Sequence, residues 1–372
     1  MRNKRFLIGA AVIALVLAAG CENYLAGKRE EAQQRWATSR AEMVTNMARH
    51  AYKRGDFARA RDQLEPVIRS STPYAPAYVL VARLSADQGD LDEARTYART
   101  ATTMDGASAE AWYVLGTVEQ SLGHREAALN AFGKAAGEEP THPRYTLAEA
   151  EMFVAIGQVD AAASSLAAAC AQMPGSGEVH AAYGDVLSRL GRYEEATGQY
   201  RIALRLKPEN AAPKERLAVA LFRSGAYAEA EAILADLQGS EPGFASGWMG
   251  LMRADCLLAL RRTDEARAMY LQQAEAAPKA VAPRVGLARC AILQDRLPEA
   301  RQHLEKALKQ HPGHAEANGL LGYVLAATGR PGEAVPYLKL AMQDPACQGR
   351  ETIRHLLACA EESSALAPAP AP

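Results

Sequence analysis

Few residues of this 372-residue chain have the type and spacing that catalysis or metal binding needs. The only clustered histidines are His303, His311 and His314, and a metal site would need a further ligand at a fixed distance. No acidic residue or cysteine stands out as that ligand, so we expect solvated loop histidines. No GxSxG, HExxH, P-loop or dinucleotide-binding motif is present. We therefore expect no enzyme, no cofactor and no metal.

The cysteines do not follow a metal-binding or redox pattern. No CxxC pair occurs, and an odd number of cysteines follows Cys21. This argues against zinc-ribbon, thioredoxin-like and c-type haem sites. A disulfide between Cys347 and Cys359 is left open, although an intervening helix would hold the two thiols apart. The remaining three are expected to be small buried residues of helices: Cys170, Cys256 and Cys290.

Cys21 itself stands in a chemically informative context. A basic start precedes the uncharged residues 6–20. This segment is shorter than the roughly twenty apolar residues of a membrane span and fits the core of a signal peptide. Residues 17–21, LAAGC, resemble the bacterial lipobox, in which the cysteine is lipidated and becomes the first residue after cleavage. We expect a lipoprotein signal peptide over residues 1–20 and acyl chains such as palmitate on Cys21. An uncleaved anchor helix is the alternative.

A repeat with a period of 34 residues organises most of the chain. Six glycines keep this spacing: Gly55, Gly89, Gly123, Gly157, Gly191 and Gly225. Six alanines follow them at a constant offset: Ala60, Ala94, Ala128, Ala162, Ala196 and Ala230. A fixed period of this length is typical of stacked repeat proteins, in which each unit buries its apolar face against its neighbours.

The copy over residues 109–142 resembles the tetratricopeptide repeat family. The residues that carry the resemblance are Trp112, Leu115, Gly116, Ala128, Phe132, Ala135 and Pro140. The resemblance implies a helix, a tight turn and a second helix, here over residues 109–122 and 125–138. Gly116 and Ala128 are small enough for a close helix approach, and Phe132 would fill the gap to the next helix.

The repeat predicts an all-α, right-handed solenoid superhelix of about nine helix–turn–helix units over residues 41–345. The predicted first residues are Ala41, Ala75, Ala109, Pro143, Gly177, Ala211, Ala245, Val281 and Ala315. The unit around Trp248 is two residues longer, and we place the extra residues in or just after its first helix. Ala259 or Arg261 would replace its turn glycine.

Segments outside the repeats are assigned by composition. Residues 21–40 would be the lipidated N-terminus with an amphipathic entry helix over residues 28–40. Residues 346–364 would hold a capping helix, and the alanine- and proline-rich residues 365–372 would be an extended, disordered tail. The formal net charge of −1 offers no basic excess for nucleic-acid binding.

The resemblance also implies a partner-binding groove. In this family the first helices line the concave face through positions two, five, nine, twelve and thirteen. In the C-terminal half these positions are Val219, Phe222, Arg223, Met249, Arg253, Cys256, Val285, Arg289, Ile292, Leu293 and Tyr323. The N-terminal half is more polar and acidic: Glu110, Tyr113, Thr117, Glu151, Asp185 and Arg189. An apolar strip with arginines suits an amphipathic helix or extended peptide with acidic groups. The alternative is that the strip packs inside a tightly wound superhelix.

These features together suggest a membrane-anchored periplasmic lipoprotein. Its repeats would act as a protein–protein interaction scaffold in assembly of a pilus, a secretion complex or an exopolysaccharide export machine. Glu22, rather than Asp, follows Cys21 and favours the periplasmic face of the outer membrane by resemblance to enterobacterial lipoproteins. An inner-membrane adaptor, or a regulatory subunit of an envelope enzyme complex, is the alternative. Protein or peptide segments and the membrane are the expected partners, with no nucleic acid and no small-molecule substrate.

Overall fold

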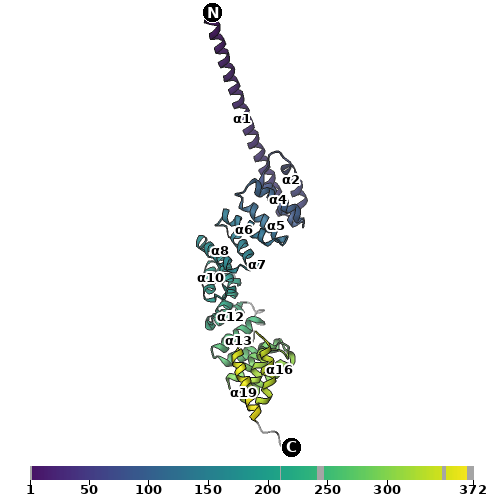
Figure 1. Ribbon diagram of the computed structural model, residues 1–372, viewed down its shortest axis with the longest axis vertical. Helices are drawn as coiled ribbons and strands as arrows, with labels where there is room; N and C mark the ends of the chain where they lie inside the picture. Colours follow the sequence, from purple (N-terminus) through teal and green to yellow (C-terminus); the bar gives the residue numbers. More distant parts are fainter. Residues whose placement is uncertain (1, 210, 241–246, 346–348, 367–372) are drawn as a thin grey trace. The chain divides into compact units, whose positions relative to one another are not determined.

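The computed structural model describes residues 2–209, 211–240, 247–345 and 349–366. These residues form nineteen α-helices and no strand. Figure 1 shows their course and labels many of them. The helices are α1 (Arg2–Lys53), α2 (Phe57–Ile68), α3 (Ala75–Asp87), α4 (Leu91–Met104), α5 (Ala109–Ser121), α6 (Arg125–Glu138), α7 (Pro143–Ala155), α8 (Val159–Gln172), α9 (Gly177–Arg189), α10 (Tyr193–Leu206), α11 (Ala211–Arg223), α12 (Tyr227–Ser240), α13 (Trp248–Ala259), α14 (Thr263–Ala276), α15 (Val281–Leu293), α16 (Leu297–Gln310), α17 (Ala315–Ala327), α18 (Pro331–Gln343) and α19 (Arg350–Leu366).

The helices alternate as the repeat predicts, and the all-α solenoid class is confirmed. The chain divides into two compact units, Met1–Val186 and Leu187–Pro372, and the boundary falls within α9. In each unit, helices joined by a short turn pack as pairs, and successive pairs stack on each other. In the first unit α3 packs on α4 and α5 on α6; in the second unit α15 packs on α16 and α17 on α18.

The turn within each pair requires a left-handed backbone. Gly123, between α5 and α6, has a φ of 79°, and the other five periodic glycines also have positive φ. Glycine adopts this conformation without the steric cost that a Cβ imposes. In two repeats a non-glycine residue takes the same place, Arg261 with φ 62° and Asp295 with φ 58°. This confirms that Arg261 replaces the turn glycine of the irregular repeat.

Side-chain caps fix the start of several helices. Asp56 and Asp90 each precede a second helix, and their carboxylates accept hydrogen bonds from the backbone amides of Arg59 and Glu93. Such caps satisfy amides that have no partner inside the helix. The first residue of α2 and that of α4 are therefore specified by an aspartate in the preceding turn.

Small residues allow the helices within a pair to approach closely. A Cβ added to Gly116 of α5 would lie 2.6 Å from two ring atoms of Phe132 on α6. Ala128 is fully buried, in a cluster with Phe132 and with Met152 of α7. Phe132 therefore fills the gap to the next helix, as predicted. It is this ring, however, and not Ala128, that comes closest to Gly116.

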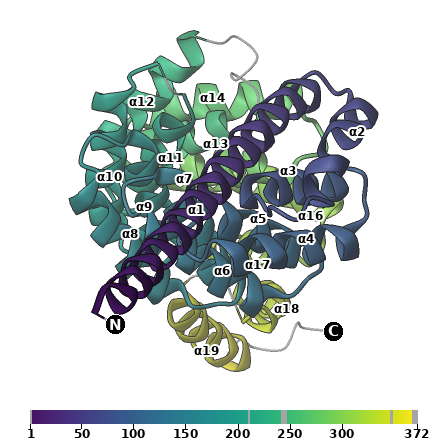
Figure 2. The same ribbon diagram turned by 90° about the horizontal axis from the view of Figure 1, so that it is seen from above.

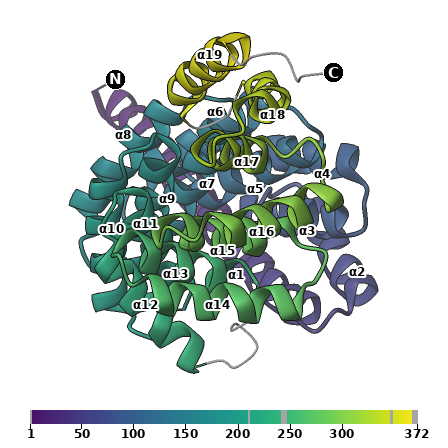
Figure 3. The same cartoon turned by 90° about the horizontal axis from the view of Figure 1, so that it is seen from below.

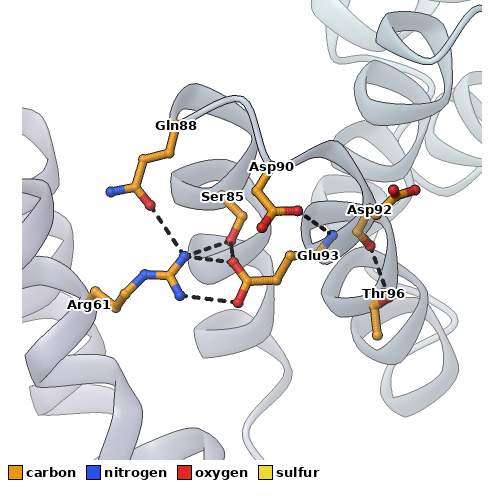
Figure 4. Close-up of polar contacts among 7 residues, drawn as sticks. All are labelled: Arg61, Ser85, Gln88, Asp90, Asp92, Glu93 and Thr96. Atoms are coloured by element: carbon orange, nitrogen blue, oxygen red, sulfur yellow. Dashed lines mark hydrogen bonds and ion pairs between the residues drawn. The ribbon is translucent and has the colours of Figure 1, made fainter.

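An ion pair joins the second helices of two consecutive repeats in the first unit. Arg61 of α2 reaches Glu93 of α4 at 2.6 Å and also donates to Ser85 of α3 and to Gln88, the residue after α3, as Figure 4 shows. Hydrogen bonds from Arg61 and Ser85 lower the pKa of the Glu93 carboxyl below its usual value. In the second unit Arg267 of α14 and Glu299 of α16 form an ion pair with the same sequence separation of 32 residues. These pairs tie one repeat to the next at partly exposed sites.

The two ends of the chain differ in part from expectation. The predicted entry helix over residues 28–40 is not a separate element, because α1 runs without a break into the first repeat (Figure 2). At the other end α19 packs on α18 and α17, in agreement with a capping helix (Figure 3). It extends to Leu366, so the predicted tail begins later than residue 365. Residues 367–372 lie outside the described residues.

Candidate binding site

The clustered histidines have structural partners. His314 precedes α17, and its Nδ1 accepts a hydrogen bond from the backbone amide of Ala317 at 3.2 Å, which caps the helix. His303 is half-buried on α16, and burial lowers its pKa although Glu299 lies 3.7 Å away. Throughout the part of the chain that is described, no group of three or more His, Cys, Asp or Glu side chains is arranged to hold a metal ion.

Burial sets the chemistry of the cysteines. Cys256 and Cys290 are buried in helices of the second unit, and burial raises the pKa of Cys256 to about 12 and that of Cys290 to about 11. Thiols with such pKa values are protonated and unreactive at neutral pH. Cys359 is an exposed free thiol of α19. Cys347, its suggested disulfide partner, lies outside the described residues.

The predicted lipid anchor remains a prediction. The backbone of residue 21 belongs to α1, but its side chain lies outside the described part of the structure. Within the described residues, no helix contains an apolar stretch long enough to cross a bilayer.

The repeat that contains α13 shifts the predicted groove by two positions. We predicted its start at Ala245, but Gly247 is the N-cap and α13 begins at Trp248. The longer connection is residues 241–247, which precede α13, compared with residues 105–108 between α4 and α5. The extra residues are therefore not in or after the first helix. Position one of this repeat is Gly247.

This shift removes three residues from the predicted groove. Met249 is 2% exposed and Cys256 is fully buried, so neither side chain can reach a partner. Arg253 instead pairs with Glu231 of α12, at 2.8 Å, and donates to Gln238 at 2.9 Å. Assigning Met249, Arg253 and Cys256 to the groove was wrong. Met249 and Cys256 belong to the buried interior, and Arg253 holds α13 to the preceding helix, α12.

The first helices of three successive repeats enclose a shallow hollow of about 340 Å³ in the second unit. It includes three of the predicted groove residues, Arg289, Ile292 and Leu293. Arg261 contributes from the turn after α13. The complete lining is Leu258, Ala259, Arg261, Arg289, Ile292, Leu293 and Leu320. The corrected register explains this set, because Leu258 and Ala259 now occupy positions twelve and thirteen.

The apolar part of the hollow is open to solvent. Leu293 is 45% exposed at the end of α15, and Tyr323 is 39% exposed on α17, one turn beyond Leu320. Leu293 lines the hollow, whereas Tyr323 is outside its lining, on the first helix of the next repeat. They offer apolar area that a bound segment would remove from water.

The charge of the hollow is more balanced than the sequence suggested. Arg289 lies 3.0 Å from Asp255 of α13, and the hydroxyl of Tyr270 donates to the same carboxylate oxygen at 2.6 Å. Burial, and then the charge and hydrogen bond of Asp255, raise the pKa of Tyr270 far above its usual range. Arg261 is exposed and contacts no carboxylate among the described residues. It is therefore the arginine that is available to an acidic partner.

The other predicted groove residues lie elsewhere on the second unit. Phe222 is half-buried against Tyr227, with ring centroids 5.6 Å apart, and Arg223 is exposed at the end of α11. Val219 is half-buried and Val285 is buried. None of these side chains lines the hollow.

In the first unit, the predicted polar positions form contacts between repeats. Glu110 pairs with Arg83 and accepts a hydrogen bond from the Tyr145 hydroxyl at 3.1 Å. Burial and this carboxylate raise the pKa of Tyr145 to about 12. The Tyr113 ring lies beneath Arg144 at 4.0 Å. This polar surface holds first helices together.

Sequence reasoning missed Leu258, Ala259, Arg261 and Leu320. The position of the turn residue, Arg261, would have identified Leu258 and Ala259. Gly123 follows the first residue of α5 by fourteen residues, and counting back the same number from Arg261 gives Gly247. The turn residue therefore defines the register better than the average period does.

Comparison with known proteins agrees with this geometry. Tetratricopeptide repeat sequence models match residues 45–111, 82–123, 113–177, 182–243, 251–307 and 291–348. Human tetratricopeptide repeat protein 7B is 32% identical over 139 residues, covering 36% of this chain and 16% of that protein. Small glutamine-rich tetratricopeptide repeat-containing protein 2 of Mycosarcoma maydis is 33% identical over 114 residues, covering 31% and 32%. The chain thus spans under a third of either curated relative.

Solved structures with similar helix arrangements include yeast Tom70, which is 12% identical with a TM-score of 0.42 and covers 87% of this chain and 96% of that one. PilF of Pseudomonas aeruginosa is 18% identical with a TM-score of 0.44 and covers 56% and 95%. The sequence models together match well over half of the chain. The protein belongs to the tetratricopeptide repeat family.

Proposed function

We propose that this protein is a membrane-anchored periplasmic lipoprotein whose repeats act as a scaffold for assembly of an envelope machine. Lipid on Cys21 would hold it at the periplasmic face of the outer membrane. A pilus, a secretion complex or an exopolysaccharide export system is the class of machine that this address suits. The proposal assigns the chain no catalytic step, no cofactor and no small-molecule substrate.

The observation that carries the scaffold proposal is the exposed apolar hollow beside α15 and α17. Leu293 and Tyr323 remain open to solvent, whereas the other large apolar residues of these helices are buried or half-buried. A partner segment that covers them gains apolar burial, and Arg261 adds a charge-assisted hydrogen bond to an acidic side chain. The occupant is therefore an amphipathic helix or an extended peptide with at least one carboxylate.

Substitution of one exposed leucine tests this assignment. The full chain, immobilised and exposed to envelope extract, should capture a defined set of proteins that Leu293→Asp reduces by about tenfold, because a charge replaces a central apolar contact. Leu340→Asp is the matched control, since Leu340 on α18 is similarly exposed but lies outside the hollow. Equal losses for both variants, or none for Leu293→Asp with the fold intact by circular dichroism, would remove the hollow as the binding site.

The membrane address rests on a separate observation, the LAAGC sequence at residues 17–21. Mass spectrometry of the N-terminus should find an acylated Cys21 as the first residue, and Cys21→Ser should leave the precursor uncleaved. An unmodified Cys21, or retention of residues 1–20, would reject the lipoprotein assignment while leaving the scaffold assignment open. Fractionation of inner and outer membranes would decide between the proposed address and an inner-membrane adaptor.

A further inference from the structure

The first repeat lacks a neighbour that other repeats have. First helices from α3 onward follow a second helix, and in the first unit that preceding helix packs on them, as α2 does on α3, α4 on α5 and α6 on α7. The same holds in the second unit for α10 on α11 and α14 on α15. The first helix of the first repeat, residues 41–53, is instead the continuation of the long helix α1, and among the described helices it packs on α2 and α3. One of its faces is therefore left without the covering helix.

Comparison of equivalent positions identifies that face. Position three of the first helix is at most 4% exposed in Ala77, Ala111, Tyr145, Val179, Met249 and Ala317. In the first repeat the same position is Met43, which is 58% exposed. Position seven is buried in Val81, Leu115, Leu217, Leu287 and Leu321, whereas in the first repeat it is Met47, which is 50% exposed. These are stacking positions that retain apolar side chains but have no partner.

The exposed face continues toward the N-terminus. Trp36, Met43 and Met47 are spaced by seven and four residues, which places them on one side of α1. Trp36 is the most exposed large apolar residue of the described chain, and the guanidinium of Arg40 lies 5.5 Å from its ring centroid. We call Trp36, Met43 and Met47 the open face.

The charges around the open face distinguish between occupants. Arg29, Arg40 and His50 share this side of α1, because each is four or seven residues from a member of the face. The exposed acidic residues of the same stretch, Glu30, Glu31 and Glu42, all project about 100° or more away from each member of the open face. A second copy paired through the same face would bring basic residues together. A helix with acidic flanks would find complementary charge.

We propose that the open face binds an amphipathic helix of a partner protein, with an alanine- and leucine-rich stripe flanked by carboxylates. This helix would take the place that a preceding repeat's second helix takes elsewhere in the chain. The open face lies in the first unit and does not depend on the hollow of the second unit, so either assignment can fail alone.

The chain itself supplies a suitable probe. The α12 sequence, Tyr227–Ser240, contains Ala230 and Leu234 on its buried face, carries Glu229, Glu231 and Asp236, and has no Lys or Arg. A fluorescein-labelled, hydrocarbon-stapled peptide of this sequence should bind the full chain saturably, measured by fluorescence anisotropy. Binding should also shift Trp36 emission to shorter wavelength, and the Trp36→Phe variant should lose that shift.

Paired variants make the test specific. Met43→Gln/Met47→Gln keeps side-chain length and helix propensity but removes apolar area, so peptide affinity should fall about tenfold or more. Met104→Gln is the control, since Met104 is another exposed methionine of the first unit and should leave affinity unchanged. A peptide with Lys at its three acidic positions should bind about tenfold more weakly at low salt.

Several results would overturn the proposal. Absence of saturable binding, or equal affinity for the Met43→Gln/Met47→Gln variant, would reject the open face as a helix site. Equal binding of the Lys-substituted peptide would reject an acidic partner. Sedimentation equilibrium that finds a dimer lost in the double variant would assign the face to a second copy. Vesicles of phosphatidylglycerol that shift Trp36 emission, with no peptide binding, would assign it to the membrane.

Discussion

The close contact between Gly116 and Phe132 gives a sharp test of the packing. Gly116→Ala places a Cβ 2.6 Å from two atoms of a ring that is 1% exposed and cannot move aside. Overpacking of this kind costs about 1–3 kcal/mol, and the gain in helix propensity offsets about 1 kcal/mol of it. We expect a net loss of up to about 2 kcal/mol in the free energy of unfolding.

Gly137 provides the matched control, because it lies in α6 and nothing stands within 4 Å of an added Cβ. Gly137→Ala should therefore stabilise the chain by up to about 1 kcal/mol. Gly116→Ala/Phe132→Leu should recover most of the loss, since it recreates the Ala48 and Leu64 pair of the first repeat, both fully buried. Urea denaturation followed by circular dichroism measures all three. A stabilising Gly116→Ala, or a double variant worse than the sum of its parts, would refute the reasoning.

Three further predictions follow from buried polar groups. Arg253→Met should lower the free energy of unfolding by about 1–3 kcal/mol, because it leaves Glu231 without its main partner. Arg223→Met, at an exposed site, should change the free energy of unfolding by under about 0.5 kcal/mol. Equal urea midpoints for the two variants would contradict the corrected register. Burial raises the pKa of Glu119, but hydrogen bonds from His124, Arg95 and Arg99 outweigh burial and hold that pKa below 4.5. The contribution of Glu119 to stability is therefore complete above pH 4.5 and is lost as the pH falls through the lowered pKa, so the stability difference between the wild type and Glu119→Gln should shrink below about pH 4.5. A difference that grows in acid would show the sign to be wrong. In the native protein Cys359 should react with a maleimide probe well before Cys256 and Cys290, because the thiols of Cys256 and Cys290 are buried and have raised pKa values. Mass spectrometry of the labelled sites checks this order. Equal labelling of the three cysteines would mean that the core opens readily.

The regular repeats were predictable because each position has a single physical requirement. A left-handed turn calls for glycine, and a close helix approach calls for a small residue, so Gly123 and Ala128 fix both helices of their repeat. The predicted second helix over residues 125–138 has the observed bounds, and the first ends within one residue of expectation.

The site was less predictable because it depends on register and on pairing. An average period cannot say where two extra residues enter the chain, and a shift of two positions moved Met249 from the groove into the core. Nor does a residue type reveal whether a charge is already paired. Arg253 and Arg289 both have carboxylate partners from adjacent helices, whereas Arg261, which the repeat pattern marked only as a turn residue, is exposed at the hollow.

We propose that partners bind at the hollow of the second unit. Its most direct test is site-specific photocrosslinking in intact cells, with p-benzoylphenylalanine at position 293 or position 340. We predict that position 293 gives a discrete crosslinked partner band, which Arg261→Glu weakens, and that position 340 gives none. Equal crosslinking from both positions, or partner bands from position 340 alone, would contradict the account.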